Sequence, residues 1–111
     1  WAVVDVGIAL DPRNIEAQVQ GAMVYALSAA IRGEITFTDG KADQQTFYDY
    51  EPLRINQCPP IQVQVLENLH RIRGIGEPAT PPATHALGNA IFALTGQRLR
   101  DLPFAKSITF A

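Results

Sequence analysis

The sequence predicts an α+β fold in which two main helices pack on a small, mostly antiparallel sheet. Two segments carry apolar residues at helical spacing, and short runs rich in β-branched residues alternate with them. Asp39-Gly40, between two of these runs, is a hairpin signal. The 111 residues suit one domain and show no repeat or low-complexity linker, so we expect a single segment, 1–111.

The first strand and the first helix are expected at the start of the chain. Residues 1–6 are rich in valine, as in a buried strand. Asp11 and Pro12 fit the N-cap and the first helical position, and Gly33 fits the end of the helix. The predicted apolar stripe consists of Ile15, Val19, Ala22, Met23, Ala26, Leu27, Ala30 and Ile31. Its many small residues predict close packing.

The middle of the chain predicts three further strands. Residues 34–38 and 46–50 are expected to pair as a hairpin around Asp39-Gly40. Prolines make residues 51–60 irregular, and residues 61–65 alternate as a strand with one buried face. Tyr48, Asp49 and Tyr50 fit either an edge strand with two aromatic residues or part of an active site.

A glycine- and proline-rich loop precedes the second helix. Its sequence is Gly74-Ile75-Gly76-Glu77-Pro78-Ala79-Thr80-Pro81-Pro82. Thr80 is expected to cap the helix, which Pro81 and Pro82 open and Gly96 ends. Its predicted apolar stripe is Ala86, Leu87, Ala90, Ile91 and Leu94, and residues 99–104 leave as an extended tail.

Composition excludes several classes of function. The net charge of −2 and the scattered arginines argue against a nucleic-acid or anionic-membrane surface. The single cysteine, Cys58, allows no internal disulfide, and His70 and His85 lie too far from other ligands to predict a metal site. No apolar run is long enough to span a bilayer.

The first residues predict neither a signal peptide nor a natural beginning. They lack a methionine and a charged leader, and the chain starts inside an expected strand. We therefore expect it to be a piece of something longer.

Glu77 is the most informative residue of the glycine- and proline-rich loop. Glycines permit unusual backbone angles and prolines fix φ, so the loop holds one carboxylate in a restricted turn. Such a residue is either a structural turn residue or a positioned proton acceptor. Taken alone, the residues favour the structural turn.

Several motifs in one register resemble a known family. They are Val4-Asp5-Val6-Gly7, Asp11-Pro12, Gln18-Val19-Gln20-Gly21, Tyr48-Asp49-Tyr50, Leu53-Arg54, residues 59–63, residues 74–82 and residues 90–96. Together they resemble the late part of the large subunit of molybdenum hydroxylases, in the xanthine dehydrogenase family. The resemblance is to the branch with isoquinoline 1-oxidoreductase and bacterial aldehyde dehydrogenases.

This resemblance implies an activity and its cofactors. The segment would be part of a larger molybdopterin-binding domain, with molybdenum held by molybdopterin as the cytosine dinucleotide and iron–sulfur clusters on a separate small subunit. Glu77 would be the general base for hydroxylation, by oxygen from water, of an aldehyde or N-heteroaromatic substrate. We expect a soluble bacterial protein, and the sequence leaves open whether its compartment is the cytoplasm or the periplasm. Under this resemblance the catalytic interpretation of Glu77 replaces the structural one.

The resemblance also implies cofactor-binding residues, each of which also fits a simpler role. Gln18 would lie near the cofactor, although it also fits a solvent-facing position on a helix. Gly21 and Gly76 would allow close approach of the backbone, or simply packing and a turn. Thr80 would donate to the pterin side or only cap the second helix.

Four positions depart from the family pattern. Val6 stands where cysteine is common, Gln20 where an acid is common, and Ala79 where glycine is common. Ala79 narrows the backbone conformations next to Glu77. Cys58 stands where a small residue is usual, and we interpret it as a packing residue.

Other parts of such an enzyme are missing from the chain. The remaining cofactor contacts of the family belong to earlier segments of the large subunit, so we expect the chain alone to be inactive and to bind no cofactor. The alternative is a non-catalytic fold fragment that associates with itself or docks on other subunits. Apolar faces left bare would then favour a homo-oligomer.

Overall fold

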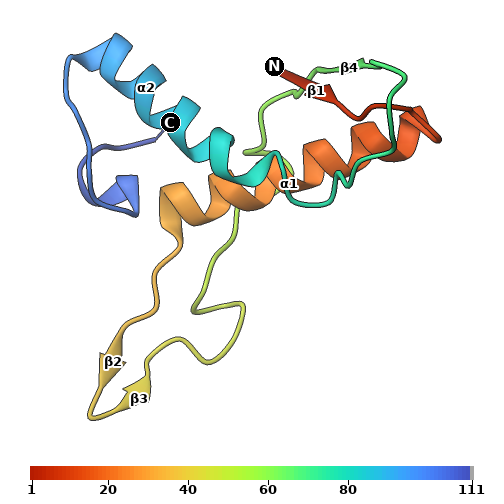
Figure 1. The fold of residues 1–111 in the computed structure, drawn as a ribbon. Coiled ribbons are helices and arrows are strands. Elements are labelled where there is room, and N and C mark those ends of the chain that lie inside the picture. The colour runs from red at the N-terminus through yellow and green to blue at the C-terminus, as the bar shows by residue number, and fades with distance from the viewer. Residues whose placement is uncertain (111) are drawn as a thin grey trace.

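The computed structural model describes residues 1–110 as two helices that cross, two small sheets and a projecting arm (Figure 1). The strands are β1 (Ala2–Asp5), β2 (Phe37–Thr38), β3 (Lys41–Ala42) and β4 (Val63–Leu66). The helices are α1 (Pro12–Arg32), α2 (Thr80–Thr95) and the short 3-10 helix η1 (Phe104–Lys106). The α+β class and both main helices are confirmed.

The expected single, mostly antiparallel sheet is wrong. β1 pairs with β4 in parallel, with Ala2 opposite Val63, and β2 pairs with β3 in a separate antiparallel sheet. The parallel pairing follows from the connection between the two strands, because α1 and the arm lie between them and form a crossover. Each sheet has two strands.

The hairpin forms where Asp39-Gly40 predicts it, but its second strand begins earlier than expected. Asp39 and Gly40 have φ of 51° and 76°, the left-handed pair that a tight two-residue turn requires. Thr38 therefore pairs with Lys41 directly, and the strand expected at 34–38 shrinks to Phe37–Thr38.

Residues 46–50, expected as a strand, form a turn instead. The Asp49 carboxylate accepts from the backbone N–H of Gln45 at 3.2 Å and of Thr46 at 3.1 Å. The Tyr50 N–H donates to the Thr46 carbonyl at 3.0 Å. These local bonds occupy the groups that a sheet would need, so no ladder forms here. The interpretation of Tyr48–Tyr50 as an edge strand is therefore wrong.

Helix α1 follows its sequence signals closely. The Asp11 carboxylate accepts from the Asn14 N–H at 3.2 Å, which confirms the predicted N-cap. The buried residues of the helix are Ile15, Val19, Ala22, Ala26, Ala30 and Ile31. Met23 and Leu27 are half-buried, so the predicted stripe is confirmed with these two at its margin.

Helix α2 buries a narrower stripe than expected. Ala83 and Ile91 are buried and Leu87 is half-buried. Ala86, Ala90 and Leu94 are exposed, Leu94 by 87%, so their assignment to the core is wrong. Few elements cover α2 besides α1 and the C-terminal tail, and only one line of side chains along it finds neighbours.

Two apolar clusters hold the elements together. The first joins Val19 and Ala22 of α1 to Ala79, with β1, β4 and Ile75 packed against it. The second joins Ala30, Ile91 and Phe104, and so fixes the C-terminal tail on both helices. The first cluster is the one that supports the loop before α2.

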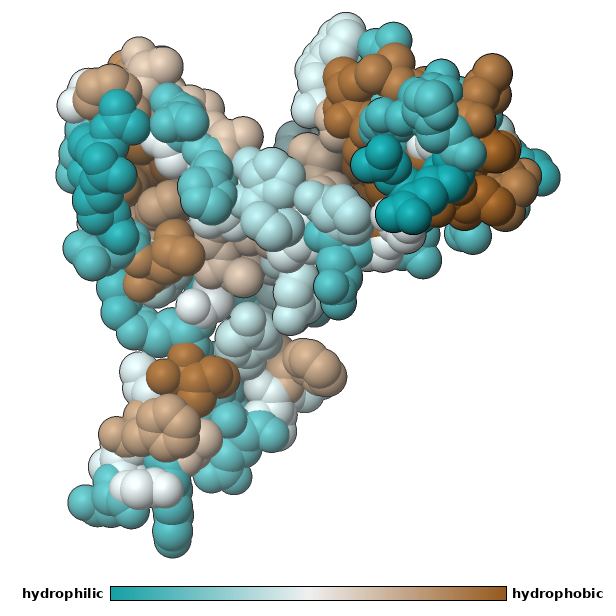
Figure 2. All heavy atoms as spheres, in the orientation of Figure 1, coloured by the Kyte–Doolittle hydropathy of each residue, from teal (hydrophilic) through white to brown (hydrophobic). Residues whose placement is uncertain are grey.

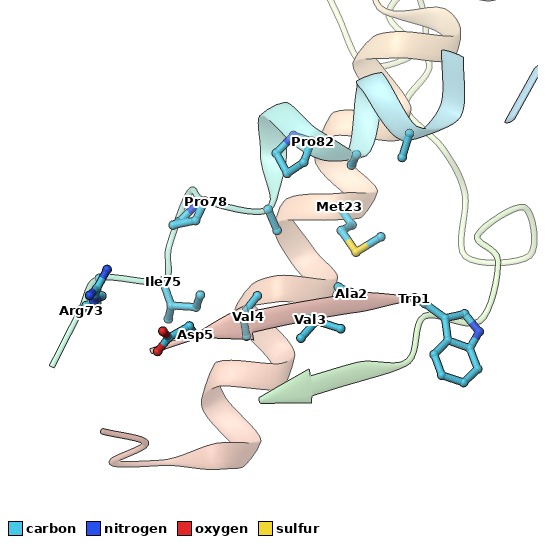
Figure 3. A pocket seen from close by; sticks show the side chains of 14 residues that line it. Trp1, Ala2, Val3, Val4, Asp5, Met23, Arg73, Ile75, Pro78 and Pro82 are labelled. Atoms are coloured by element: carbon cyan, nitrogen blue, oxygen red, sulfur yellow. The ribbon is translucent and has the colours of Figure 1, made fainter. Parts of the chain in front are cut away.

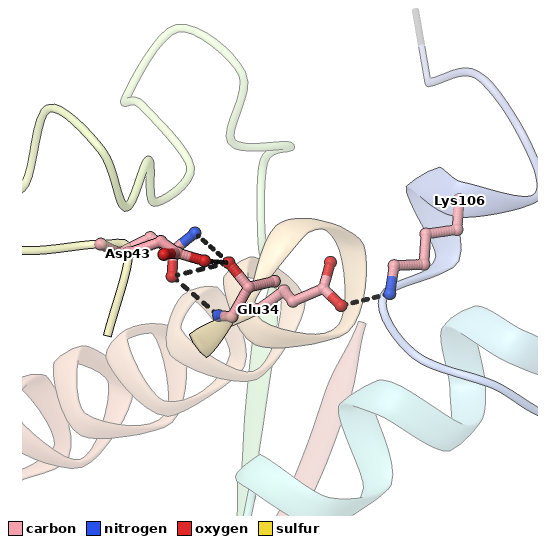
Figure 4. A network of polar contacts seen from close by, with 5 residues as sticks. Glu34, Asp43 and Lys106 are labelled. Atoms are coloured by element: carbon pink, nitrogen blue, oxygen red, sulfur yellow. Dashed lines mark hydrogen bonds and ion pairs between the residues drawn. The ribbon is translucent and has the colours of Figure 1, made fainter. Parts of the chain in front are cut away.

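Residues 34–50 form an arm that projects away from both helices (Figure 1). At its root, Glu34 forms an ion pair with Lys106 of η1 (Figure 4). The arm carries exposed large side chains with apolar or aromatic character, Ile35, Phe37, Phe47 and Tyr48. Figure 2 shows brown and tan surface on the arm, above a teal and white tip.

Candidate functional site

The turn that carries Glu77 is anchored on both sides by apolar contacts. Ile75 packs against the first cluster, and Ala79 is buried within it, 6% exposed. Their partners are Val19 and Ala22 on one face of α1. The residues two positions before and two positions after Glu77 are therefore fixed, and the turn between them is a short span.

Ala79 does not disturb this turn, although glycine is common at its position in the family pattern. Its backbone angles are φ −80° and ψ −12°, in the ordinary right-handed helical region that any residue adopts. Its methyl group fills part of the first cluster. The turn therefore does not need glycine at this position, and the expected restriction by alanine has no consequence for its geometry.

The Glu77 side chain itself is exposed to solvent. Within residues 1–110 its carboxylate takes part in no hydrogen bond and in no ion pair, and neighbouring Arg73 does not pair with it. The backbone carbonyl of Glu77 accepts from the Thr80 N–H at 2.9 Å and so closes the turn. The backbone is fixed, and the acid is left free to accept a proton or a hydrogen bond from outside.

A half-open cavity of about 520 Å³ lies beside this turn (Figure 3). Its walls come from residues 1–5, residues 73–75, Met23 of α1 and the first two turns of α2. Pro78 and Ala79 line it, whereas Glu77 between Gly76 and Pro78 does not. The charged groups on its walls are Asp5 and Arg73. Sequence reasoning missed this cavity, because its walls come from four separate segments.

The expected cofactor residues fall into two groups. Gly76 and Glu77 lie in the turn before α2, and Thr80 is the first residue of that helix. Gln18 and Gly21 are exposed on α1, whereas their neighbours Val19 and Ala22 face the core. A Cβ atom at Gly21 or Gly76 would meet open space, so packing inside the described chain does not require glycine at either position.

Thr80 is not the cap of α2. The residue before the helix is Ala79, and no side chain caps this end. The Thr80 N–H already donates to Glu77, and Pro81 and Pro82 have no N–H to satisfy. Few backbone N–H groups at this end of the helix therefore remain for a capping hydroxyl to accept from. The capping role expected for Thr80 is wrong.

Gln20 has a structural role that the sequence analysis did not assign. Its side-chain amide donates to the Ile61 carbonyl and to the Glu16 carboxylate, both at 3.1 Å. The bond to Ile61 ties α1 to the segment that leads into β4. An acid, which is common at this position in the family pattern, could not donate to a carbonyl while it is ionised.

Two carboxylates have a lowered pKa, and both lie in the arm. Hydrogen bonds from the Gln45 backbone and the Thr46 side chain lower the pKa of Asp49. Hydrogen bonds from Thr36 and Thr38 lower the pKa of Asp43, which Figure 4 shows beside the root of the arm. These bonds stabilise the ionised form and serve the arm's own structure.

In the part of the chain that the structure describes, no group of three His, Cys, Asp or Glu side chains is arranged to hold a metal ion. No helix among these residues has the length and apolar character needed to cross a membrane. Cys58 is half-buried, and its thiol lies 3.6 Å from the Pro59 carbonyl oxygen.

Comparison with known proteins assigns the chain to a family. Residues 1–59 match the molybdopterin cofactor-binding domain family. The chain belongs to this family. The resemblance stated from its motifs, to the molybdopterin-binding large subunit of molybdenum hydroxylases, is confirmed. The family match ends before the loop that carries Glu77.

Relatives of this molybdopterin cofactor-binding domain also cover the second half of the chain. The isoquinoline 1-oxidoreductase subunit beta of Brevundimonas diminuta is 32% identical over 97% of this chain and 14% of its own length. A membrane-bound aldehyde dehydrogenase (pyrroloquinoline-quinone) of Gluconacetobacter polyoxogenes is 35% identical over 91% of this chain and 13% of its own length. The chain thus spans about a seventh of such relatives.

A solved structure has the same fold. Quinoline 2-oxidoreductase from Pseudomonas putida 86 aligns with a TM-score of 0.79 and 26% identity, over 92% of this chain and 14% of that one. The molybdopterin cofactor-binding domain described above is therefore homologous to parts of oxidoreductase subunits.

Proposed function

We propose that this chain is the part of a molybdenum hydroxylase large subunit that supplies the general base, Glu77. The observation that carries the proposal is the contrast within one turn. Ile75 and Ala79 are fixed in the first cluster, whereas the carboxylate between them is exposed and has no partner within residues 1–110. A rigid turn with an unused acid suits a group that acts on something outside the chain.

Exposed polar groups of the turn and of α1 fit a polar cofactor presented from outside. Gln18 and Glu77 are exposed and Thr80 is half-exposed, and among the described residues none of these side chains has a hydrogen-bond partner. An amide, a hydroxyl and a carboxylate together offer donors and acceptors for the oxygen and nitrogen atoms of a pterin. We assign Gln18, Gly21, Gly76 and Thr80 to the cofactor side of the site.

When bound, the molybdopterin cofactor would supply the redox chemistry that takes electrons from the substrate. The task of this chain is then proton transfer. A Glu77 carboxylate oxygen would accept the proton of a water-derived hydroxyl as that hydroxyl attacks an electron-poor carbon. Because the turn is already fixed, little entropy is lost when the base is aligned.

The substrate class follows from the relatives. Their names specify isoquinoline, quinoline and aldehyde as substrates of those proteins. An N-heteroaromatic ring carbon next to nitrogen and an aldehyde carbon are both electron-poor sp² centres. We therefore propose one of these two classes as the substrate, with iron–sulfur clusters on a partner subunit taking up the electrons.

The replacement Glu77→Gln in the complete enzyme tests the proposal. It keeps the shape of the side chain and removes its basicity, so kcat should fall by roughly a hundred- to ten-thousand-fold. Molybdenum and pterin content should stay near the wild-type values. The matched control is Glu16→Gln, at another exposed carboxylate, which should leave kcat unchanged. Turnover of a tenth or more of wild type in the Glu77 variant would end the assignment.

The alternative, a non-catalytic fragment that associates with itself or docks on other subunits, is favoured by the bare apolar arm. Molybdenum and pterin content separates the two functions. Purified material that contains this chain, lacks both and forms oligomers supports the alternative, and cofactor in the assembly supports the hydroxylase.

A further inference from the structure

The loop that leads to Glu77 lies on the turn that follows β1. We call residues 67–73 the strap and residues 5–9 the β1 turn. The Leu69 N–H donates to the Gly7 carbonyl at 2.9 Å, and the Arg73 N–H donates to the Val6 carbonyl at 3.1 Å. Two backbone bonds thus fix the strap at its middle and at its end, and the second lies four residues before Glu77.

Side chains add to this attachment at the beginning of the strap. One Asp5 carboxylate oxygen accepts from the Gly7 N–H at 2.9 Å, and the other accepts from the Asn68 side-chain amide at 2.7 Å. The Glu67 carboxylate accepts from the Ala9 N–H at 2.7 Å. Asp5 therefore holds the β1 turn and the strap with one charged group, and such bonds are the stronger kind.

Gly7 makes the close contact possible. Its φ is +75°, and a Cβ atom there would lie 1.8 Å from the Arg71 carbonyl oxygen. No other residue fits without moving the strap. Leu69 also has positive φ, at 60°, an uncommon conformation for leucine that persists where surrounding contacts impose it.

Solvent could satisfy most of these exposed groups equally well, so the bonds add little to the overall stability of folding. These bonds instead determine the direction in which the chain leaves the strap. After the strap ends at Arg73, the chain has only Gly74 before Ile75 enters the first cluster. The path into the Glu77 turn is thereby restricted on its upstream side.

We propose that Asp5 and Asn68 are positioning residues, which act through the strap to hold the Glu77 turn in its working geometry. This inference rests on the function proposed for Glu77. Asp5 lines the cavity beside the turn, and its bond to Asn68 spans 63 positions of sequence. If the strap is released, the base moves while every residue of the turn remains unchanged.

Exchanging the two side chains of the Asp5–Asn68 pair tests the proposal in the complete enzyme. Asn68→Asp places two carboxylates face to face but keeps the acceptor for the His70 N–H, which donates to the Asn68 oxygen at 3.1 Å. kcat should fall by roughly tenfold to a hundredfold, because small misplacement of a catalytic group costs that much. Adding Asp5→Asn restores a donor and an acceptor with reversed direction, and kcat should return to near wild type.

A second measurement follows the strap without activity. Gly7→Ala should accelerate hydrogen exchange of the Leu69 and Arg73 amides severalfold. Gly40→Ala is the matched control, because Gly40 has the same left-handed backbone, with φ of +76°, but open space around its Cβ position. It should leave both amides unchanged. Unchanged exchange in the Gly7 variant, or an Asn68→Asp variant with wild-type kcat or without rescue, would overturn the proposal.

The double variant Asn68→Asp with Glu77→Gln separates this inference from the function on which it rests. If the strap acts through Glu77, Asn68→Asp should cause no further loss of kcat in the Glu77→Gln background. A loss as large as in the wild-type background would show that the strap serves something else. Failure of the proposed function is read separately, from the activity that Glu77→Gln alone retains.

Discussion

At the scale of single residues, two alanines and a valine decide where the candidate base sits. Ala79 lies in the cluster with Val19 and Ala22, and Ile75 packs on the same cluster from the other side of the turn. The small side chains of α1 let the loop approach the helix closely. The acid is exposed between Ile75, which is half-buried, and Ala79, which is buried.

The bond from Gln20 to Ile61 gives a prediction about stability. Gln20→Glu would place an ionised carboxylate against the Ile61 carbonyl and against Glu16 one helical turn away. The free energy of unfolding should fall by roughly 1–3 kcal/mol at neutral pH, because a partly buried acceptor loses its donor. Urea denaturation of the chain measures this change.

Gln18→Glu is the control for that measurement. Gln18 lies on the same helix, is exposed, and has no hydrogen-bond partner among residues 1–110. Its replacement should change the free energy of unfolding by about 0.5 kcal/mol or less. Equal effects at the two positions would show that the bond to Ile61 contributes nothing specific.

Some residue-level features could be predicted and others could not. The Asp11 cap was evident, because an aspartate before Pro12 at the start of an apolar stripe is typical of a helix N-terminus. Thr80 fitted the same pattern and failed, since the prolines after it remove the donors that a cap would satisfy. The sequence thus contained two conflicting signals, a threonine that favours a cap and prolines that remove the donors for it.

At the scale of elements, helices were predictable and strand pairing was not. Helical spacing and end signals are local, so α1 and α2 could be inferred from neighbouring residues. β1 and β4 pair across about sixty positions, and nothing local specifies a parallel partner. The extent of the hairpin failed because Asp49 draws residues 45–50 into a turn.

The lowered pKa of Asp49 predicts how the arm responds to acid. The ionised carboxylate is bound in the folded arm, so its stabilising effect is present above the ordinary pKa of 3.8 and is lost as the pH falls below that value. The backbone amide protons of Gln45 and Thr46, which are donated to this carboxylate, should then exchange faster with solvent. Hydrogen exchange followed by NMR between about pH 5 and pH 3 measures this.

The variant Asp49→Asn provides the comparison. An amide oxygen can still accept these bonds but does not titrate near this pH. Its exchange rates at Gln45 and Thr46, corrected for the intrinsic effect of pH, should show no step in the same range. A step of equal size in both proteins would assign the effect to another group.

At the scale of the whole molecule, the chain is too extended for a compact domain of its length. Its radius of gyration is 16.4 Å, whereas a compact domain of this size has about 13 Å. Its accessible surface is 8116 Å², against roughly 6,000 Å² for a compact monomer of this mass. Large apolar side chains are exposed on this surface, several of them on the arm, and brown patches are visible in Figure 2.

This surface predicts association of the chain when it is alone. Sedimentation should give a mass above the 12.1 kDa of one chain, rising with concentration. Phe37→Ser with Phe47→Ser should shift the balance toward the single chain, because these side chains are 69% and 78% exposed on the arm. Gln45→Ser is the polar control. A folded chain that stays single at all concentrations would contradict the prediction.

Only part of the candidate site could be predicted from the sequence. Glu77 and its turn could be found from residues 74–82, because glycine and proline mark a fixed backbone locally. The cavity, the buried methyl of Ala79 and the strap could not, since each depends on segments far apart in sequence. Long-range contacts of this kind leave no local pattern.

The most direct test of the central claim is the position of the Glu77 carboxylate in a structure of the complete, cofactor-loaded enzyme. We expect a carboxylate oxygen within roughly 3.2 Å of the water-derived oxygen at the molybdenum centre, or one water molecule away. A Glu77 side chain that points into bulk solvent, with the centre beyond that reach, would contradict the account.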